Sequence, residues 1–186
     1  SHEYAAKLDS ILRLSDTKTH SLTAAVISSV VPQLTGTIRE APKIAFGIDA
    51  LSVGPGVKTG INIHCDDPSS VGADLICVSV AAAKKYGSPC IIVDMGTATT
   101  ISAISADGAY LGGCICPGVR ISLDALISRT AQLPGISLGE PQRAIGHNTV
   151  DCMQSGVMIG AAAMLDGMVE RMEEELGAPV KVIVTG

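Results

Sequence analysis

The sequence predicts an α/β protein, and three observations carry that prediction. Hydrophobic residues make up 47 % of the 186 residues, and aromatic residues only 2 %. The core must therefore be packed mainly from Ala, Val, Ile, Leu and Met, which suits helices on sheets better than an aromatic-rich β-sandwich. Short apolar runs typical of buried strands also alternate with longer segments of helical periodicity.

The N-terminal part is expected to contain short strands and two helices. Helices are predicted over residues 3–14 and 33–41, and strands over residues 24–31, 50–53 and 61–64. In the first helix one apolar face is expected to hold Tyr4, Leu8, Ile11 and Leu12. Between the last two strands, GPGVKTG has three glycines and a proline, and this composition predicts a loop.

The rest of the chain is expected to build a sheet flanked by helices. A helix is predicted over 71–86, followed by strands over 90–94, 99–105 and 109–116, with a hairpin turn at Asp107-Gly108. A helix over 119–128, a loop over 130–148, a helix over 151–176 and a strand over 180–184 follow. The long helix as far as Ala163, and the last strand, are nearly apolar, so both are expected to be buried.

Composition and charge disfavour several classes of protein. The net charge of −5 and the lack of a helix-turn-helix pattern argue against nucleic acid as a partner. We expect no membrane segment, because no apolar run approaches the ~20 residues that cross a bilayer, and no signal peptide is visible. The six cysteines then indicate thiols in a reducing cytoplasm. Cys114-Ile-Cys116 could form half of a metal site, but the sequence lacks a second cysteine pair at ligand spacing. We therefore favour two small residues on one face of a strand.

The segment VDMGTATTISA, residues 93–103, places a carboxylate, a glycine and hydroxyls at the tip of a hairpin. Gly96 permits close approach of an oxyanion, and Thr97 and Thr99 offer hydroxyl donors. Asp94 is suited to hold a cation against a bound phosphate. An ordinary turn also favours Asp and Gly, but it does not explain three threonines beside a strand aspartate.

A second candidate site lies at the start of the helix that leads into this strand. Gly72-Ala73-Asp74 opens the helix after a glycine loop and a polar turn. A carboxylate there can act as general base for a hydroxyl, and a helix N-terminus can receive an anion. The alternative is a first-turn aspartate placed there by the helix dipole, and Asp74 taken alone favours that alternative.

Taken together, these segments resemble type III pantothenate kinase, of the acetate kinase/sugar kinase/Hsp70/actin-like superfamily. The resemblance covers nearly the whole chain, in matching order and spacing. It rests on ISSVVP (27–32), VGPGVKTGINI (53–63), VGAD (71–74), DMGTATT (94–100), GGCICPG (112–118), LP (133–134), NTVDCMQSG (148–156) and VIVTG (182–186).

The resemblance implies an actin-like ATPase (ribonuclease H-like) fold with two similar subdomains, here residues 1–70, incomplete at the N-terminus, and 71–186. It implies ATP-dependent phosphorylation of pantothenate to 4′-phosphopantothenate, the first step of coenzyme A synthesis, in a cytoplasmic homodimer. ATP, Mg²⁺ and a monovalent cation, K⁺ or NH₄⁺, are the implied cofactors.

The resemblance also implies a role for each site residue. Asp74 is the expected base, and residues 72–75 (Gly72, Ala73, Asp74 and Leu75) line the pantothenate site. Thr97 contacts ATP phosphate and Asp94 binds the monovalent cation. Thr149 contacts pantothenate from the partner subunit, and His147 is given a weaker binding role there.

Three positions depart from the pattern of the family, all on the pantothenate side. Leu75 stands where an arginine is usual, Cys65 where a tyrosine packs on pantothenate, and Ser70 where an acidic residue is common. Leucine makes no charged contact, and cysteine removes an aromatic wall. A different acceptor alcohol, or a non-catalytic regulatory relative of the transcription-accessory type, is therefore an alternative.

The family's N-terminal Asp-x-Gly-Asn-Thr loop, which holds phosphate and Mg²⁺, does not occur in residues 1–186. The family motif that begins with VIVTG continues with further glycines, and these are not part of residues 1–186 either. We therefore expect that residues 1–186 alone do not turn over ATP. Steady ATP consumption by this stretch would contradict that expectation.

Overall fold

The computed structural model describes residues 1–186, apart from the side chain of His20. The chain forms two compact units, one of Ser1–Ile61 with Asp66–Val80 and one of Asn62–Cys65 with Ala81–Gly186. The first unit is called the N-terminal unit below, and the second the C-terminal unit. Both combine strands with helices, which confirms the predicted mixed α/β class.

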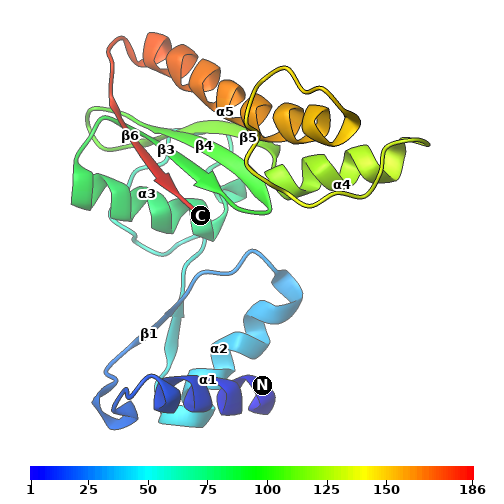
Figure 1. Ribbon diagram of the computed structural model, residues 1–186. Helices are drawn as coiled ribbons and strands as arrows, with labels where there is room; N and C mark the ends of the chain where they lie inside the picture. Colours follow the sequence, from blue (N-terminus) through cyan, green and yellow to red (C-terminus); the bar gives the residue numbers. More distant parts are fainter. The chain divides into compact units, whose positions relative to one another are not determined.

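The N-terminal unit holds a two-stranded parallel sheet with helices beside it (Figure 1). Its elements are α1 (His2–Leu14), η1 (Thr19–Ser21), β1 (Ala25–Ile27), α2 (Pro32–Phe46), β2 (Ala50–Ser52), η2 (Pro68–Ser70) and the first part of α3 (Ala73–Tyr86). The register pairs Ala25 with Ala50 and Ile27 with Ser52. Because parallel strands end at the same edge, the loops after β1 and β2 leave this sheet on one side.

Several N-terminal elements differ from the predicted ones. β1 stops at Ile27 rather than at residue 31, because the Ser29 hydroxyl accepts a hydrogen bond from the Val31 amide and stabilises a loop. α2 continues through Pro42, which is buried, and ends at Gly47 in the left-handed conformation. In α1, Ile11 is 61 % exposed, and the buried position is Ala5.

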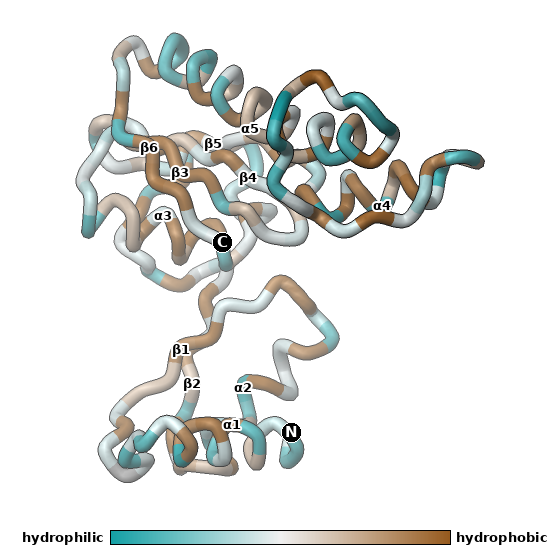
Figure 2. The backbone as a smooth tube through the Cα atoms, in the orientation of Figure 1, coloured by the Kyte–Doolittle hydropathy of each residue, from teal (hydrophilic) through white to brown (hydrophobic). Residues whose placement is uncertain are grey.

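The C-terminal unit contains a four-stranded sheet in the order β5-β4-β3-β6 (Figure 1). Its strands are β3 (Cys90–Met95), β4 (Ala98–Ile104), β5 (Tyr110–Pro117) and β6 (Lys181–Thr185). β3 pairs antiparallel with β4, and β4 with β5, as the hairpin signal at Asp107-Gly108 predicts, while β6 is parallel to β3. β3 is a fully apolar run from Cys90 to Val93, and it appears as such in Figure 2.

Two helices complete the core of the C-terminal unit. α5 (Thr149–Leu176) packs Met164, Met168 and Met172 against the buried cluster of Ile91, Val93 and Ile101. Its first turns place Met153 and Val157 against Leu123 of α4 (Val119–Arg129). Aliphatic and Met side chains therefore make up both clusters, as the low aromatic content predicts.

Three further predictions, for α5, for β6 and for residues 61–64, are wrong. The first half of α5 is only partly buried, since Gly156, Gly160, Ala162 and Ala163 are exposed. β6 is an edge strand bonded only to β3, so Val184 is 64 % exposed rather than buried. The expected strand over 61–64 is reduced to one bridge between Ile63 and Tyr110, next to a register shift in β5.

α5 also changes one expectation about membranes. By length and composition this helix of 28 residues, with a window of mean hydropathy 1.3, is long and apolar enough to cross a bilayer. Core helices of globular domains meet the same criteria, and α5 contributes side chains to both core clusters. Length and hydropathy are therefore weak evidence for a membrane span here.

Candidate functional site

Three strand ends meet at one edge of the four-stranded sheet. β5 and β6 both run parallel to β3, so Met95, Pro117 and Thr185 end their strands on the same side. In open α/β sheets ligands bind outside the carboxyl ends of the strands. The segment DMGTATT lies at this edge, at the tip of the predicted hairpin, and its role in ligand binding stays a prediction.

Close backbone contacts define the tip of the β3–β4 hairpin. Gly96 and Thr97 form the connection between the strands, and both are exposed. The Gly118 amide donates to the Thr97 carbonyl at 3.2 Å, and a β-carbon on Gly118 would overlap the carbonyl oxygens of Thr97 and Gly96. Gly118 is the N-cap of α4, so the first turn of that helix begins beside the hairpin tip. Helix N-termini carry partial positive charge and unpaired amides.

The register places Asp94 between two threonines. Asp94 pairs with Thr100 of β4 and with Thr185 of β6, and cross-strand partners share a face of the sheet. Asp94 is partly buried, and its two register partners on that face both carry a hydroxyl group. Thr100 and Thr185 were not among the predicted site residues. Strand alternation from Asp94 would have identified Thr100, because paired positions follow from the hairpin turn.

Thr99 lies on the opposite face of the sheet from Asp94. It pairs with Met95 and Cys116, and its side chain is 3 % exposed. That face carries Ile101, which packs against α5. The structure therefore brings together Asp94, Gly96 and Thr97 at the edge of the sheet and directs Thr99 toward the core.

Asp74 lies in the first turn of α3, as predicted, but it belongs to the N-terminal unit, whereas residues 71–186 were expected to form the second subdomain. It is exposed, and its Oδ1 accepts a hydrogen bond from the Leu75 amide at 2.8 Å. A β-carbon on Gly72 would overlap that carboxylate and would lie 3.5 Å from Val30 Cγ1. Because Gly72 has no side chain, the Asp74 carboxylate can occupy its β-position. Ala73, between them in the sequence, is buried.

Thr149 and His147 lie at the start of α5. Asn148 caps this helix by accepting from the Asp151 amide at 2.9 Å, and its side-chain amide donates to the Asp151 carboxylate at 3.0 Å. Thr149 is exposed at the first helical position, and His147 Nδ1 lies 3.4 Å from the Arg143 guanidinium.

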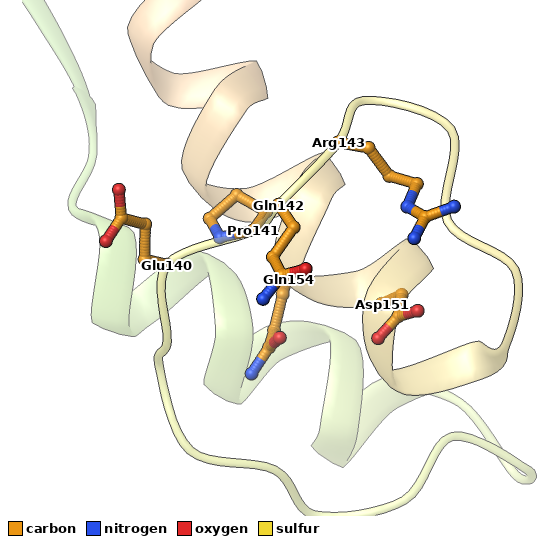
Figure 3. Close-up of a pocket in the computed structure, with 6 residues that line it drawn as sticks. All are labelled: Glu140, Pro141, Gln142, Arg143, Asp151 and Gln154. Atoms are coloured by element: carbon orange, nitrogen blue, oxygen red, sulfur yellow. The ribbon is translucent and has the colours of Figure 1, made fainter.

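The loop before α5 is held against the helix. The Ser155 hydroxyl donates to the Ala144 carbonyl at 2.6 Å, and the Cys152 thiol donates to the Gly146 carbonyl at 3.4 Å. A polar cavity of about 320 Å³ lies between this loop and the helix (Figure 3). Its lining residues are Glu140, Pro141, Gln142, Arg143, Asp151 and Gln154.

The three departures from the family pattern lie in separate places. Leu75 follows Asp74 on α3 and is partly buried. Ser70 ends η2, where its hydroxyl donates to the Asp67 carbonyl at 2.7 Å. Cys65 lies in the C-terminal unit, and a β-carbon on Gly112 would be 3.8 Å from its sulfur.

Comparison with protein families matches residues 1–171 to the family described as type III pantothenate kinase. The chain belongs to the type III pantothenate kinase family. A type III pantothenate kinase of Koribacter versatilis (strain Ellin345) is 52 % identical over 161 residues, which are 87 % of this chain and 59 % of the relative. One of Myxococcus xanthus (strain DK1622) is 46 % identical over 165 residues, 89 % of this chain and 64 % of the relative. The chain thus spans less than two thirds of the length of these type III pantothenate kinases.

A crystal structure shows a similar fold. It is the conserved putative Baf family transcriptional activator from Campylobacter jejuni, with a TM-score of 0.55 at 20 % identity. The similarity covers 85 % of this chain and 68 % of that chain. At this identity the match supports the fold alone.

The resemblance predicted from the sequence motifs is confirmed by the family match.

Proposed function

We propose that the protein transfers the γ-phosphoryl group of ATP to the primary hydroxyl of pantothenate, giving 4′-phosphopantothenate for coenzyme A synthesis. The family match over residues 1–171 carries this proposal. Support comes from the two candidate sites: the start of α3 carries Asp74, and the edge of the C-terminal sheet carries Asp94 and Thr97. Phosphoryl transfer depends mainly on positioning and on neutralising charge.

In this proposal Asp74 is the general base. Its exposed carboxylate has one oxygen fixed by the Leu75 amide, which holds it in one orientation at the start of α3. It takes the proton of the pantothenate hydroxyl as the oxygen attacks phosphorus. Gly72, Ala73 and Leu75 line the acceptor around it.

The phosphates of ATP lie at the edge of the C-terminal sheet in this proposal. Gly96 admits the phosphate to the backbone, and the Thr97 hydroxyl donates to it. The start of α4 beside Gly118 adds partial positive charge. Thr99 as a direct phosphate ligand stays a prediction, and its burial favours an indirect role in holding the hairpin.

Cations neutralise the phosphate charge in this proposal. Asp94, flanked by Thr100 and Thr185, offers the oxygen ligands that suit K⁺ or NH₄⁺. Among the described residues no group of three or more His, Cys, Asp or Glu side chains is placed to hold a metal. The resemblance implies that the family's N-terminal Asp-x-Gly-Asn-Thr loop helps to hold Mg²⁺, which when bound would withdraw charge from the transferred phosphoryl group.

We further propose a cytoplasmic homodimer with an actin-like fold of two subdomains, residues 1–70 and 71–186. Exposed small residues on α5, including Gly156 and Gly160, suit a helix that packs closely on a second copy. Thr149 and His147 would then reach pantothenate bound by the partner. Light scattering of the full-length protein at increasing concentration tests the dimer.

The decisive experiment uses the full-length protein with ATP, Mg²⁺, K⁺ and pantothenate, and follows 4′-phosphopantothenate by mass. We expect product, and we expect Asp74→Asn to lower kcat by about 10²- to 10⁴-fold, the usual contribution of a positioned base. Lys58→Ala, in the loop after β2, is a control expected to keep most activity. A folded protein that forms no product would overturn the proposal and favour a ligand-binding regulator.

A further inference from the structure

Val30 is an exposed valine beside the candidate base. It lies in the loop between β1 and α2, and its side chain is 57 % exposed. A β-carbon on Gly72 would meet Val30 Cγ1 at 3.5 Å on one side and the Asp74 carboxylate on the other. The Asp74 carboxylate occupies the β-position that Gly72 leaves free, and a methyl of Val30 lies next to that position.

The loop that carries Val30 is held by side-chain hydrogen bonds. The Val31 amide donates to Ser29 Oγ at 3.3 Å, and Thr35 Oγ1 lies 2.9 Å from both Ser29 Oγ and the Val31 carbonyl. Pro32 then begins α2 at once. Valine itself has few rotamers, since both methyls branch at Cβ. Val30 therefore presents a fixed apolar surface.

We propose that Val30 determines acceptor specificity by contacting the carbon next to the reacting hydroxymethyl group of the substrate. This inference rests on the proposed function. In pantothenate that neighbouring carbon carries two methyl groups, so a hydroxyl placed at Asp74 brings an apolar quaternary carbon close to the base. Removing water from two facing apolar surfaces favours binding, and an acceptor without the methyls gains none of it.

The chemistry of position 75 strengthens this inference. The side chain of Leu75 carries no charge and no hydrogen-bonding group, so it makes no polar contact with an acceptor. Apolar contact beside Asp74 therefore carries a larger share of acceptor recognition. The geometry assigns that contact to Val30 because, after the Asp74 carboxylate oxygen, its methyl is the nearest side-chain atom to the β-position of Gly72, at 3.5 Å.

The test compares pantothenate with its analogue lacking both methyl groups, using full-length protein at saturating ATP. The quantity measured is the ratio of kcat/KM for the two acceptors. We expect Val30→Ala to reduce this preference for pantothenate by about fivefold or more, mainly through a higher KM for pantothenate. The KM for ATP should stay unchanged. Val31→Ala is the matched control, because Val31 is 45 % exposed in the same loop.

Each outcome decides one question. A lower preference in Val30→Ala, with wild-type preference in Val31→Ala, supports the specificity role. An active wild type whose preference is unchanged by Val30→Ala, or changed equally by Val31→Ala, overturns the inference and leaves the proposed function standing. A wild type without product overturns both. Val30→Thr keeps the shape and replaces one methyl by a hydroxyl, so it should also lower the preference if Val30→Ala folds poorly.

Discussion

The edge of the C-terminal sheet and the start of α3 hold their candidate residues by different means. At the sheet edge, backbone lies directly against backbone, since Gly118 packs on the carbonyls of Gly96 and Thr97. At the start of α3, Asp74 is exposed. Its carboxylate occupies the β-position that Gly72 leaves free, beside the side chain of Val30. The first site tolerates little change of shape, whereas the second can change its side chains while its backbone stays in place.

This difference suits the two halves of the proposed reaction. Every kinase must place the same phosphate groups of ATP, and a hairpin built on buried strands gives them a fixed position. The acceptor differs from one kinase to another, and side chains on an exposed helix start and on loops can be exchanged to match it. Leu75 and Ser70, which depart from the family pattern, both lie in the N-terminal unit near Asp74 in the sequence.

Gly118→Ala is expected to have the largest effect on the sheet edge. The new β-carbon would overlap two backbone carbonyl oxygens, which cannot move without displacing the hairpin. We expect a loss of about 3 kcal/mol in the free energy of unfolding, or no folded protein. Urea unfolding of the full-length protein measures it. Gly135→Ala, at a loop glycine with open space around it, is the control and should change stability little. Equal stability of both variants would contradict the close contact.

Gly72→Ala should affect activity while leaving stability nearly intact. Here the added methyl meets the Asp74 carboxylate, a side chain that can rotate away. Because a displaced base loses its alignment, we expect kcat to fall by about a hundredfold. The free energy of unfolding should change by less than about 0.5 kcal/mol. Steady-state kinetics and urea unfolding of one preparation check both. A large loss of stability with normal kcat would reverse the contrast between the two sites.

Thr97 and Thr99 lie in one hairpin but differ in exposure. Thr97 is exposed at the tip, so Thr97→Ala should raise the KM for ATP and leave stability unchanged. Thr99 is buried on the face toward α5, so Thr99→Ala should cost about 1 kcal/mol of stability with a smaller effect on ATP. ATP titrations and unfolding curves separate these effects. An ATP defect in Thr99→Ala at unchanged stability would restore Thr99 as a phosphate ligand.

The sequence predicted the sheet of the C-terminal unit well, because its signals were local. An apolar run ends in Asp94, and Asp107-Gly108 marks the second hairpin. The predictions failed where burial depends on distant partners. Val184 is apolar but lies on an edge strand, and Gly156 belongs to an apolar helix of which one face remains exposed.

For the candidate sites, the motifs predicted residues but not the faces on which they lie. Thr99 and Thr100 are adjacent in the sequence, and only the hairpin register shows that Thr100 shares a face with Asp94. Val30 lies in the motif ISSVVP, but it was expected within the strand over 24–31, and no role beside Asp74 was assigned to it. Its proximity to Asp74 depends on the fold that brings the loop after β1 to the start of α3 within the N-terminal unit.

The smallest expected effect concerns the buried thiol of Cys90, in the first position of β3. Burial raises the pKa of this thiol above its ordinary value, with a smaller opposing effect from Lys181. The folded state therefore holds the proton more tightly than the unfolded state. That stabilisation is present below the ordinary thiol pKa and is lost as the pH rises through it toward the higher folded value.

We therefore expect the free energy of unfolding to fall between pH 8 and about pH 10, with a slope for this thiol below about 1.4 kcal/mol per pH unit. Urea unfolding across this range measures the slope, and Cys90→Ala should reduce it. Cys152→Ala, at an exposed cysteine, is the matched control and should keep it. If both variants keep the wild-type slope, Cys90 ionises as freely in the folded state as in the unfolded chain. β3 would then be more accessible to solvent than the 0 % exposure of Cys90 indicates. The backbone contacts of Gly118 with Gly96 and Thr97 would remain as the observation that supports a rigid hairpin.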